Sequence, residues 1–228
     1  MSNSHLAVHT NISPNQSGKR SRAIDRITPH CVVGQCTAEA LGALFANPGR
    51  QASSNYGIDR DGRVGMYVEE DCVSWCSSSG ANDGRAVTIE CALDVDAPWA
   101  FRQIVFDTLI DLCVDICKRN CKKKLLWFGD KDVTLAYTPS PDEMILTVHR
   151  WFAQDGRRCP GDWCYERLPI LAEKVTSKLN PEPETHWYDE AMKWAEDNKI
   201  MMDGRPNDPV TRAEMATMLM RYDALKTY

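Results

Sequence analysis

The sequence lacks any long hydrophobic run. No apolar segment approaches the ~18 residues that a transmembrane helix needs. The N-terminal segment 1–8 also lacks the basic start and the apolar core of a secretory signal peptide. We therefore expect a protein without a membrane span that is made in the cytoplasm and is not exported by the usual signal.

A strong excess of charge of either sign is also missing, because the net charge is only −5 over 228 residues. The one basic run, Lys118 to Lys124, contains no aromatic residues. It falls at the end of a predicted helix, where cations complement the helix dipole. We therefore expect no nucleic-acid partner.

Cysteine, in contrast, is plentiful, with ten residues. Disulfide frameworks belong mainly to short secreted chains. These cysteines lie mostly inside apolar segments, so we expect them to be reduced. With 43% hydrophobic and 26% charged residues the composition is that of a globular protein, and the length allows one full domain and a small second one.

Segments typical of strands and of helices alternate along most of the chain. β-rich segments occur at residues 24–28, 56–60, 63–68, 86–91, 125–128 and 144–148, and helical patterns occur at 37–45 and 98–119. Thr37 and Asp96 are the expected N-caps of the two helices, and Asp61-Gly62 is a hairpin signal. The alternation predicts an α/β fold with a central mixed β-sheet flanked by helices.

Residues 144–148 allow two interpretations. The preceding Ser140 to Glu143 resembles a capping box, which favours a helix. We favour an extended segment, because a strand here would carry His149 to a strand end beside His30.

Two histidines and one cysteine are the candidate metal ligands. His149 and Cys159 lie ten residues apart across a predicted turn, and His30 follows a short apolar strand. Two imidazoles and a thiolate suit a tetrahedral zinc ion whose fourth position is left to water. Cys31 and Cys164 are not counted, since a fourth protein ligand would displace that water. The spacing alone is weak, because ten cysteines and five histidines form accidental pairs easily.

A family resemblance strengthens this interpretation. It rests on His30, Ser53 to Ile58, Val87 to Cys91, His149 and Cys159-Pro160-Gly161, in that order. This order is similar to that of the type 2 N-acetylmuramoyl-L-alanine amidases, zinc enzymes that are related to peptidoglycan recognition proteins and occur in many phage endolysins. The resemblance covers roughly residues 1–175 and implies that His30, His149 and Cys159 bind zinc and that Glu90 is the general base.

Arg157 departs from the family pattern, in which many members have lysine two residues before the last ligand. Arginine keeps the positive charge but is a fixed cation, so it suits oxyanion stabilisation better than proton donation. Asn55, Tyr56 and Trp151 are candidate substrate-binding residues. Packing in the core is the alternative role for each aromatic residue among them.

The resemblance implies a function. The protein would use zinc-activated water to hydrolyse the amide between the lactyl group of muramic acid and L-alanine in peptidoglycan. The simplest biology is a phage or prophage endolysin that acts at the bacterial cell wall after release. Two rivals remain: a noncatalytic peptidoglycan-binding protein, and a cysteine peptidase that uses Cys159 with His149 as its base.

A domain boundary is predicted near residue 180. The Pro/Glu-rich segment 179–186 has the composition of a stiff linker. It would separate a zinc amidase domain, 1–178, from a helical module, 187–228.

The module resembles a single S-layer homology repeat. It consists of an amphipathic helix, a loop and a second helix that Thr211 and Glu214 open as a capping box. In its family this repeat binds secondary cell-wall polymers, and Trp187, Trp194 and Arg212 are the candidate contacts. Because so short a module buries little core, we also expect self-association, and a plain oligomerisation hairpin is the alternative.

Overall fold

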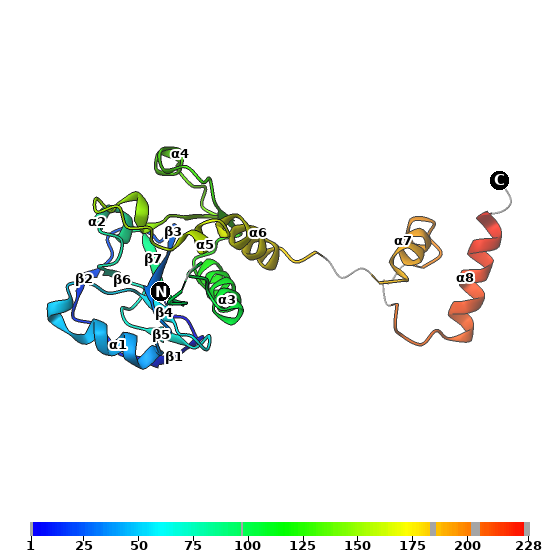
Figure 1. The fold of residues 1–228 in the computed structure, drawn as a ribbon. Helices are drawn as coiled ribbons and strands as arrows, with labels where there is room; N and C mark the ends of the chain where they lie inside the picture. The colour runs from blue at the N-terminus through cyan, green and yellow to red at the C-terminus, as the bar shows by residue number, and fades with distance from the viewer. Residues whose placement is uncertain (1, 97, 183–185, 202–205, 226–228) are drawn as a thin grey trace. The chain divides into compact units, whose positions relative to one another are not determined.

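The computed structural model in Figure 1 describes residues 2–96, 98–182, 186–201 and 206–225. The chain divides into two compact units, Met1–Pro181 and Glu182–Tyr228, and each is described by itself. Residues 183–185 of the predicted linker and 203–205 of the predicted loop lie outside the described residues. Among the described helices, none is long and apolar enough to cross a lipid bilayer.

The first unit is built on a seven-stranded mixed sheet with the strand order β1-β5-β4-β7-β3-β9-β8. Its strands, together with the separate pair β2–β6, are β1 (Ala7–Thr10), β2 (Gln16–Lys19), β3 (Arg26–Val33), β4 (Tyr56–Ile58), β5 (Val64–Met66), β6 (Cys72–Ser74), β7 (Ala86–Leu93), β8 (Lys124–Leu126) and β9 (Glu143–Leu146). Only the β4–β5 pair of the larger sheet is antiparallel within the described residues. The sequence-based prediction of a mixed sheet is confirmed.

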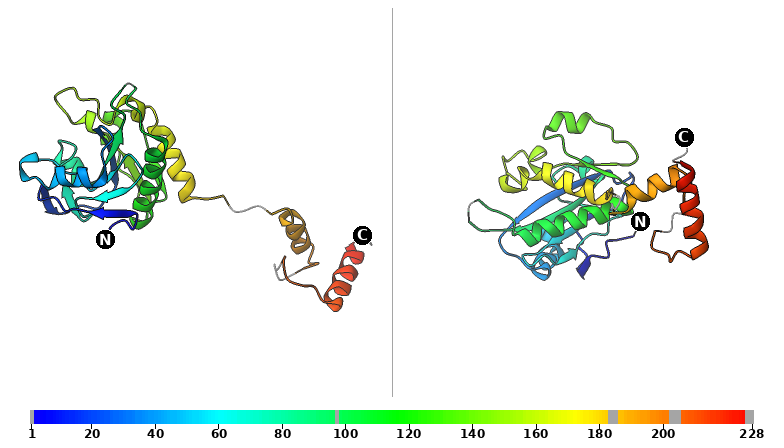
Figure 2. Two further views of the ribbon diagram at one scale, coloured as in Figure 1. Left: turned by 60° about the horizontal axis from the view of Figure 1, so that its bottom comes forward. Right: turned by 90° about the vertical axis from the view of Figure 1, so that its right-hand side faces the viewer.

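Helices cover both faces of this sheet. They are α1 (Ala38–Ala46), α2 (Gly80–Asp83), α3 (Gln103–Arg119), α4 (Lys131–Ala136), α5 (Asp162–Tyr165) and α6 (Leu168–Leu179), with the 3-10 turns η1 (Pro48–Arg50) and η2 (His149–Trp151). Figures 1 and 2 show α3 and α6 together on one side of the sheet and α1 on the other. The sheet is therefore the middle layer of three.

The two long strands at the centre of the sheet are largely buried because both of their faces are covered. β3 and β7 pair in parallel over eight residues, from Arg26 opposite Ala86 to Val33 opposite Leu93. All residues of β7 except Glu90 are buried. A parallel strand between two helical layers reads as a continuous hydrophobic run, so a glutamate in its middle is a departure that calls for an explanation.

The longest helix begins later than the sequence predicts. α3 starts at Gln103, and its N-cap is Arg102 rather than Asp96, without a side-chain capping bond. Trp99 has a positive φ of 52°, which a helix does not allow, and its N–H donates to the Asp96 carbonyl in a turn. The five residues before Gln103 therefore form a loop. The apolar periodicity predicted a helix that begins at Pro98, five residues too early.

Three local predictions are confirmed. Thr37 caps α1 by accepting a hydrogen bond from the Ala40 N–H, and β4 and β5 form the hairpin around Asp61-Gly62. Residues 143–146 form β9 rather than a helix. Strand boundaries differ: β3 begins at Arg26 rather than Ile24 and continues beyond His30, paired with β7 to its end at Val33, and β4 and β5 are shorter than predicted.

The second unit contains α7 (Asp189–Asp197) and α8 (Arg212–Leu225). The predicted capping box is present: the Glu214 N–H donates to Thr211 Oγ1 (3.2 Å), and the Thr211 N–H donates to Glu214 Oε2 (2.8 Å). α8 has no buried residue, so the described unit has almost no core of its own.

Candidate active site

His30 and Glu90 are neighbours across the two central strands. In the parallel ladder His30 lies opposite Glu90, and on its other side Glu90 lies opposite Gly57 of β4. Paired residues of adjacent strands project from the same face of a sheet. A Cβ at Gly57 would lie 2.5 Å from Leu41 Cδ2, so glycine here lets α1 pack closely over this face.

His149 and Cys159 are held together by the loop that joins them. The Arg150 backbone N–H and its Nε both donate to the Cys159 carbonyl, each over 3.2 Å. An ion pair between Arg150 Nη1 and Asp162 Oδ1 (3.1 Å) fixes the guanidinium. Arg150, which follows His149 directly, therefore holds Cys159 close to His149 although the two candidate ligands are ten residues apart in the sequence.

The two histidines and Cys159 form one cluster. One potential ligand atom of each lies within 4.8 Å of the other two. His30 Nδ1 is 3.4 Å from Cys159 Sγ, and the two imidazole centroids are 4.9 Å apart. With Zn–N and Zn–S bonds of about 2.0–2.3 Å, the donor atoms of a tetrahedral zinc site lie roughly 3.5 Å apart. The spacing and the donor types therefore fit a zinc ion.

Both imidazoles are neutral near pH 7. Burial, followed by electrostatic repulsion from the neighbouring His149 and from Arg157, lowers the pKa of His30 well below 6.5. Burial, followed by the charge of Arg157, lowers the pKa of His149 to about 4. Neutral imidazole is the form that ligates a metal.

The Cys159 thiol is protonated in the metal-free protein. A hydrogen bond with Cys31, and then burial, raise the pKa of Cys159 well above 9.0. A nucleophilic cysteine needs the opposite shift, toward a thiolate at neutral pH. The environment of Cys159 thus favours a metal ligand, whose thiol loses its proton when the metal binds. It does not favour a peptidase nucleophile.

Glu90 faces the same space as these ligands. Burial raises the pKa of Glu90 to about 7, an effect that Arg50 opposes. Cys76 Sγ lies 3.9 Å from Glu90 Oε1, whereas Glu90 Oε2 has no hydrogen-bond partner in the described part of the chain. A carboxyl group with a pKa near neutrality can both accept and release a proton, as a general base must.

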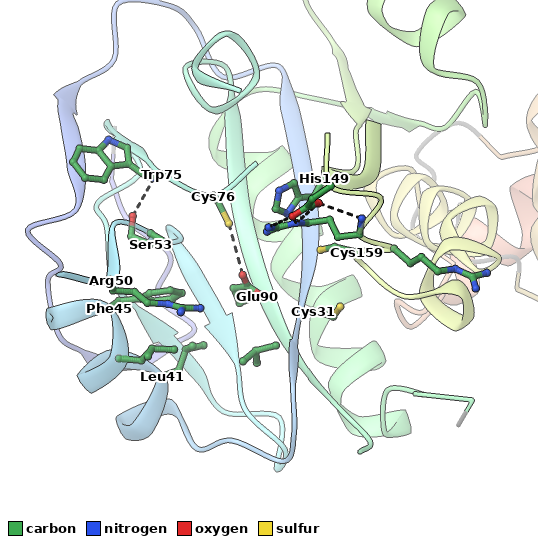
Figure 3. Close-up of a pocket in the computed structure, with 16 residues that line it drawn as sticks. Cys31, Leu41, Phe45, Arg50, Ser53, Trp75, Cys76, Glu90, His149 and Cys159 are labelled. Atoms are coloured by element: carbon green, nitrogen blue, oxygen red, sulfur yellow. Dashed lines mark hydrogen bonds and ion pairs between the residues drawn. The ribbon is translucent and has the colours of Figure 1, made fainter. Parts of the chain in front are cut away.

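A cavity of about 640 Å³ opens over these groups. Figure 3 shows Glu90, Cys76, His149 and Cys159 gathered on its wall. The other wall is formed by α1 with η1 and by the β6 loop, which contribute Leu41, Leu44, Phe45, Arg50, Ser53 and Trp75. The cavity therefore brings two candidate metal ligands, His149 and Cys159, and the candidate base Glu90 opposite a wall of mixed apolar and polar side chains.

A family model described as N-acetylmuramoyl-L-alanine amidase matches residues 20–162, which include all three candidate ligands and Glu90. The chain belongs to this amidase family. It is accordingly an N-acetylmuramoyl-L-alanine amidase, and peptidoglycan is its substrate. A second model, the S-layer homology domain, matches residues 183–216. Among curated protein sequences none is a match.

Solved structures agree with the amidase fold. The structure of PlyL has a TM-score of 0.51 at 13% identity, over 75% of this chain and 97% of that chain. A selenomethionyl AmpD derivative has a TM-score of 0.52 at 16% identity, over 75% and 99%. The Staphylococcus aureus hydrolase AmiA in complex with its ligand has a TM-score of 0.50 at 13% identity, over 75% and 84%. At these identities the similarity shows the fold alone.

Arg157 lies on the wall of the amidase cavity. Its Nε donates to both carboxylate oxygens of Asp155 at 2.9 Å, and about half of the side chain is exposed. The guanidinium therefore points into accessible space, with an acidic partner that orients it.

Two predicted substrate residues of the amidase require a correction. Asn55 and Tyr56 have 0% exposed surface, so neither offers a surface to substrate. The Asn55 side chain bonds the backbone of Thr88 and of the β5–β6 connection, and the Tyr56 hydroxyl donates to Glu70. Both residues sit at the start of β4, where the sheet is covered, and their polar groups serve the scaffold.

The remaining predicted contacts are accessible to different degrees. Trp151 is half-buried and stacks on Trp127 with ring centroids 5.1 Å apart. In the second unit Trp187 is 93% exposed, Trp194 is 47% exposed and Arg212 is exposed. Each of these side chains therefore has exposed surface that a ligand of its own unit can contact.

Cys76 and Ser78 belong to the amidase site but were not predicted. Cys76 contacts Glu90, and Ser78 Oγ is hydrogen-bonded to His149 Nε2 over 3.0 Å. Ser78 also has a positive φ of 60°, which is unusual for a residue other than glycine. The only sequence signal is the polar run Ser77 to Gly80 after a β-rich segment, and it does not indicate which residues the loop will meet.

Proposed function

We propose that this amidase is a zinc enzyme in which His30, His149 and Cys159 hold the metal and Glu90 is the general base. The observation that carries the proposal is the cluster of two neutral imidazoles and a thiol beside a carboxyl group with a raised pKa. When bound, zinc would supply a Lewis acid for the scissile carbonyl and lower the pKa of water.

Glu90 moves the proton in this proposal. Its carboxylate takes the proton of the attacking water, and the same carboxyl group hands it to the leaving amine of L-alanine. A pKa of about 7 suits both steps, since the group is neither too weak a base nor too weak an acid near neutral pH.

Arg157 stabilises negative charge as it develops on the carbonyl oxygen. Its guanidinium lies on the cavity wall and stays charged throughout the reaction. Asp155 keeps the side chain in place at the rim.

The second unit directs the enzyme to its insoluble substrate in our proposal. The S-layer homology match supports binding to a secondary cell-wall polymer through Trp187, Trp194 or Arg212. A unit with almost no core of its own also supports self-association. An amidase joined to a wall-directed module suits a phage or prophage endolysin, made in the cytoplasm and active at the cell wall after release.

The test is to digest purified peptidoglycan and to identify the new termini. The proposal expects free L-alanine amines and lactyl carboxylates in equal amounts, about one zinc per chain, and loss of cleavage when a chelator removes the metal. Cleavage at a different bond would contradict the assigned amide. Full activity after complete removal of the metal, together with inactivation by a thiol-alkylating reagent, would favour the cysteine peptidase.

A further inference from the structure

A second cavity, of about 570 Å³, lies beside the active site. It is bounded by the start of β3, by α2, by α4 and by the segment Trp151–Gln154. We propose that this cavity binds an oxyanion, and that the anion is a carboxylate of the substrate's own peptide. The choice of the peptide rests on the proposed function, whereas the oxyanion site does not.

The lining of this cavity is cationic. Three arginines and one lysine contribute to it, namely Arg22, Arg26, Arg85 and Lys131, and none of the described lining residues is acidic. This concentration of positive charge stands out in a chain whose net charge is −5. A surface of one sign in a concave site attracts a ligand of the opposite sign.

Arg26 is the strongest indication of a ligand. The residue is only 6% exposed, and its Nε has no hydrogen-bond partner among the residues that the structure describes. Its Nη1 donates to Asn82 Oδ1 over 3.2 Å, so the side chain is held with part of its donor fork unused. A buried guanidinium N–H without a partner is costly, and an oxyanion is the ligand that matches this fork.

The neighbouring cations leave positive charge to be neutralised. Arg85 is paired with Asp25, through Nε–Oδ1 over 2.9 Å. Arg22 is exposed, and neither it nor Lys131 has an ion pair within the described ranges. Among these four cationic side chains, Arg85 thus has a carboxylate partner in the described ranges and the other three have none, and a bound anion would relieve the repulsion among them.

The cavity is connected to the catalytic centre. A shallow hollow of about 300 Å³ shares Ser78 and Phe152–Gln154 with the cationic cavity, and it shares Asp155 and Arg157 with the cavity over Glu90. Ser78 is also hydrogen-bonded to His149. A ligand that extends from the scissile bond along this hollow therefore reaches the arginines without leaving the protein surface.

This continuity favours the substrate's peptide as the source of the anion. Peptidoglycan peptides carry free carboxylates a few bonds from the amide that the enzyme cleaves. Phosphate groups of a wall polymer have the same charge and acceptor chemistry, and the experiment below distinguishes the two sources.

The test compares two soluble muropeptide substrates, one with free peptide carboxylates and one with these groups amidated. Amidation should lower kcat/KM of the full-length wild type about tenfold, the loss of one charge-assisted contact. In Arg22→Gln and Arg26→Gln the two substrates should differ by threefold or less. Arg102→Gln, which removes an exposed arginine before α3, should keep the wild-type ratio. Arg22 is exposed, so its variant remains informative if the Arg26 variant does not fold.

A second measurement, the binding of inorganic phosphate by calorimetry, needs no turnover and so separates this site from the proposed function. If amidation has no effect but both arginine variants weaken phosphate binding about tenfold, the oxyanion site stands and its ligand is a phosphate. If neither amidation nor phosphate binding responds to Arg22 and Arg26, the proposal is wrong. If the full-length wild type cleaves neither substrate but still binds phosphate through Arg22 and Arg26, the proposed catalytic roles are wrong and the oxyanion site stands.

Discussion

His30 and Glu90 each keep one buried polar atom, Nε2 and Oε2, without a hydrogen-bond partner among the described residues. Such an atom costs about 1–3 kcal/mol in a folded protein. Cores that serve only stability rarely retain one. Two in adjacent positions of a β ladder support a ligand site at this position of the sheet.

Ser78 gives the first prediction, because its hydroxyl is hydrogen-bonded to Nε2 of His149, a proposed metal ligand. Ser78→Gly removes this hydroxyl but eases a backbone at φ 60°, so zinc affinity should fall about tenfold while thermal stability stays the same or rises. Competition with a chelator measures the affinity. If affinity and stability change together, Ser78 has only a structural role.

The pKa of His149 gives the second prediction. Because the folded state lowers this pKa from 6.5 to about 4, the metal-free protein favours the neutral imidazole. The resulting stability is fully present above pH 6.5 and is lost as the pH falls toward 4, by no more than about 3 kcal/mol. Urea unfolding of metal-free wild type and of His149→Asn across this range tests it. Identical pH profiles would contradict the assignment, since asparagine does not titrate.

The proposed ligands and the proposed base could be identified from the sequence, whereas their surroundings could not. His30, Glu90, His149 and Cys159 occupy motif positions around strands, and parallel pairing brings such positions together. Burial is a tertiary property, so the sequence could not show that Asn55 would face inward.

At the scale of the elements, periodicity located strands and helices better than their ends. The apolar repeat of α3 identified the helix, but the loop containing Trp99 was counted as part of it. Where a specific side chain defines an end, as Thr37 does for α1, the prediction is confirmed. Helix ends are decided by local capping and backbone conformation, which apolar periodicity does not contain.

The capping box of α8 provides a prediction at this scale. Thr211→Ala removes the acceptor of the Glu214 N–H and should cost the helix about 1 kcal/mol. Hydrogen exchange at the amides of the first turns should speed up roughly fivefold, whereas Thr211→Ser should change it little. Equal exchange in the alanine and serine variants would show that the box does not stabilise α8.

At the scale of the whole molecule, we expect the two units to have separable tasks. All proposed catalytic residues lie in the first unit, and α6 ends at Leu179 with the Asn180 side chain bonded to the Lys123 carbonyl. A chain that ends at Asn180 should therefore bind zinc and cleave soluble fragments like the full-length protein. Its hydrolysis of intact walls should fall tenfold or more, because a second binding unit raises the effective concentration on an insoluble substrate.

Light scattering and wall sedimentation on both chains distinguish the two roles proposed for the second unit. A lower mass after truncation indicates self-association, and an unchanged mass with lost wall binding indicates a polymer-binding module. If truncation changes neither, both roles are wrong.

The central claim is that Glu90 acts as the base beside a metal that it does not bind. The direct measurement is zinc content together with turnover of a soluble muropeptide in Glu90→Gln, which keeps the shape of the side chain and removes its basicity. We predict wild-type zinc content and a rate lowered by about 10² or more. Unchanged turnover would contradict the account, and loss of the zinc would show that Glu90 is a ligand instead.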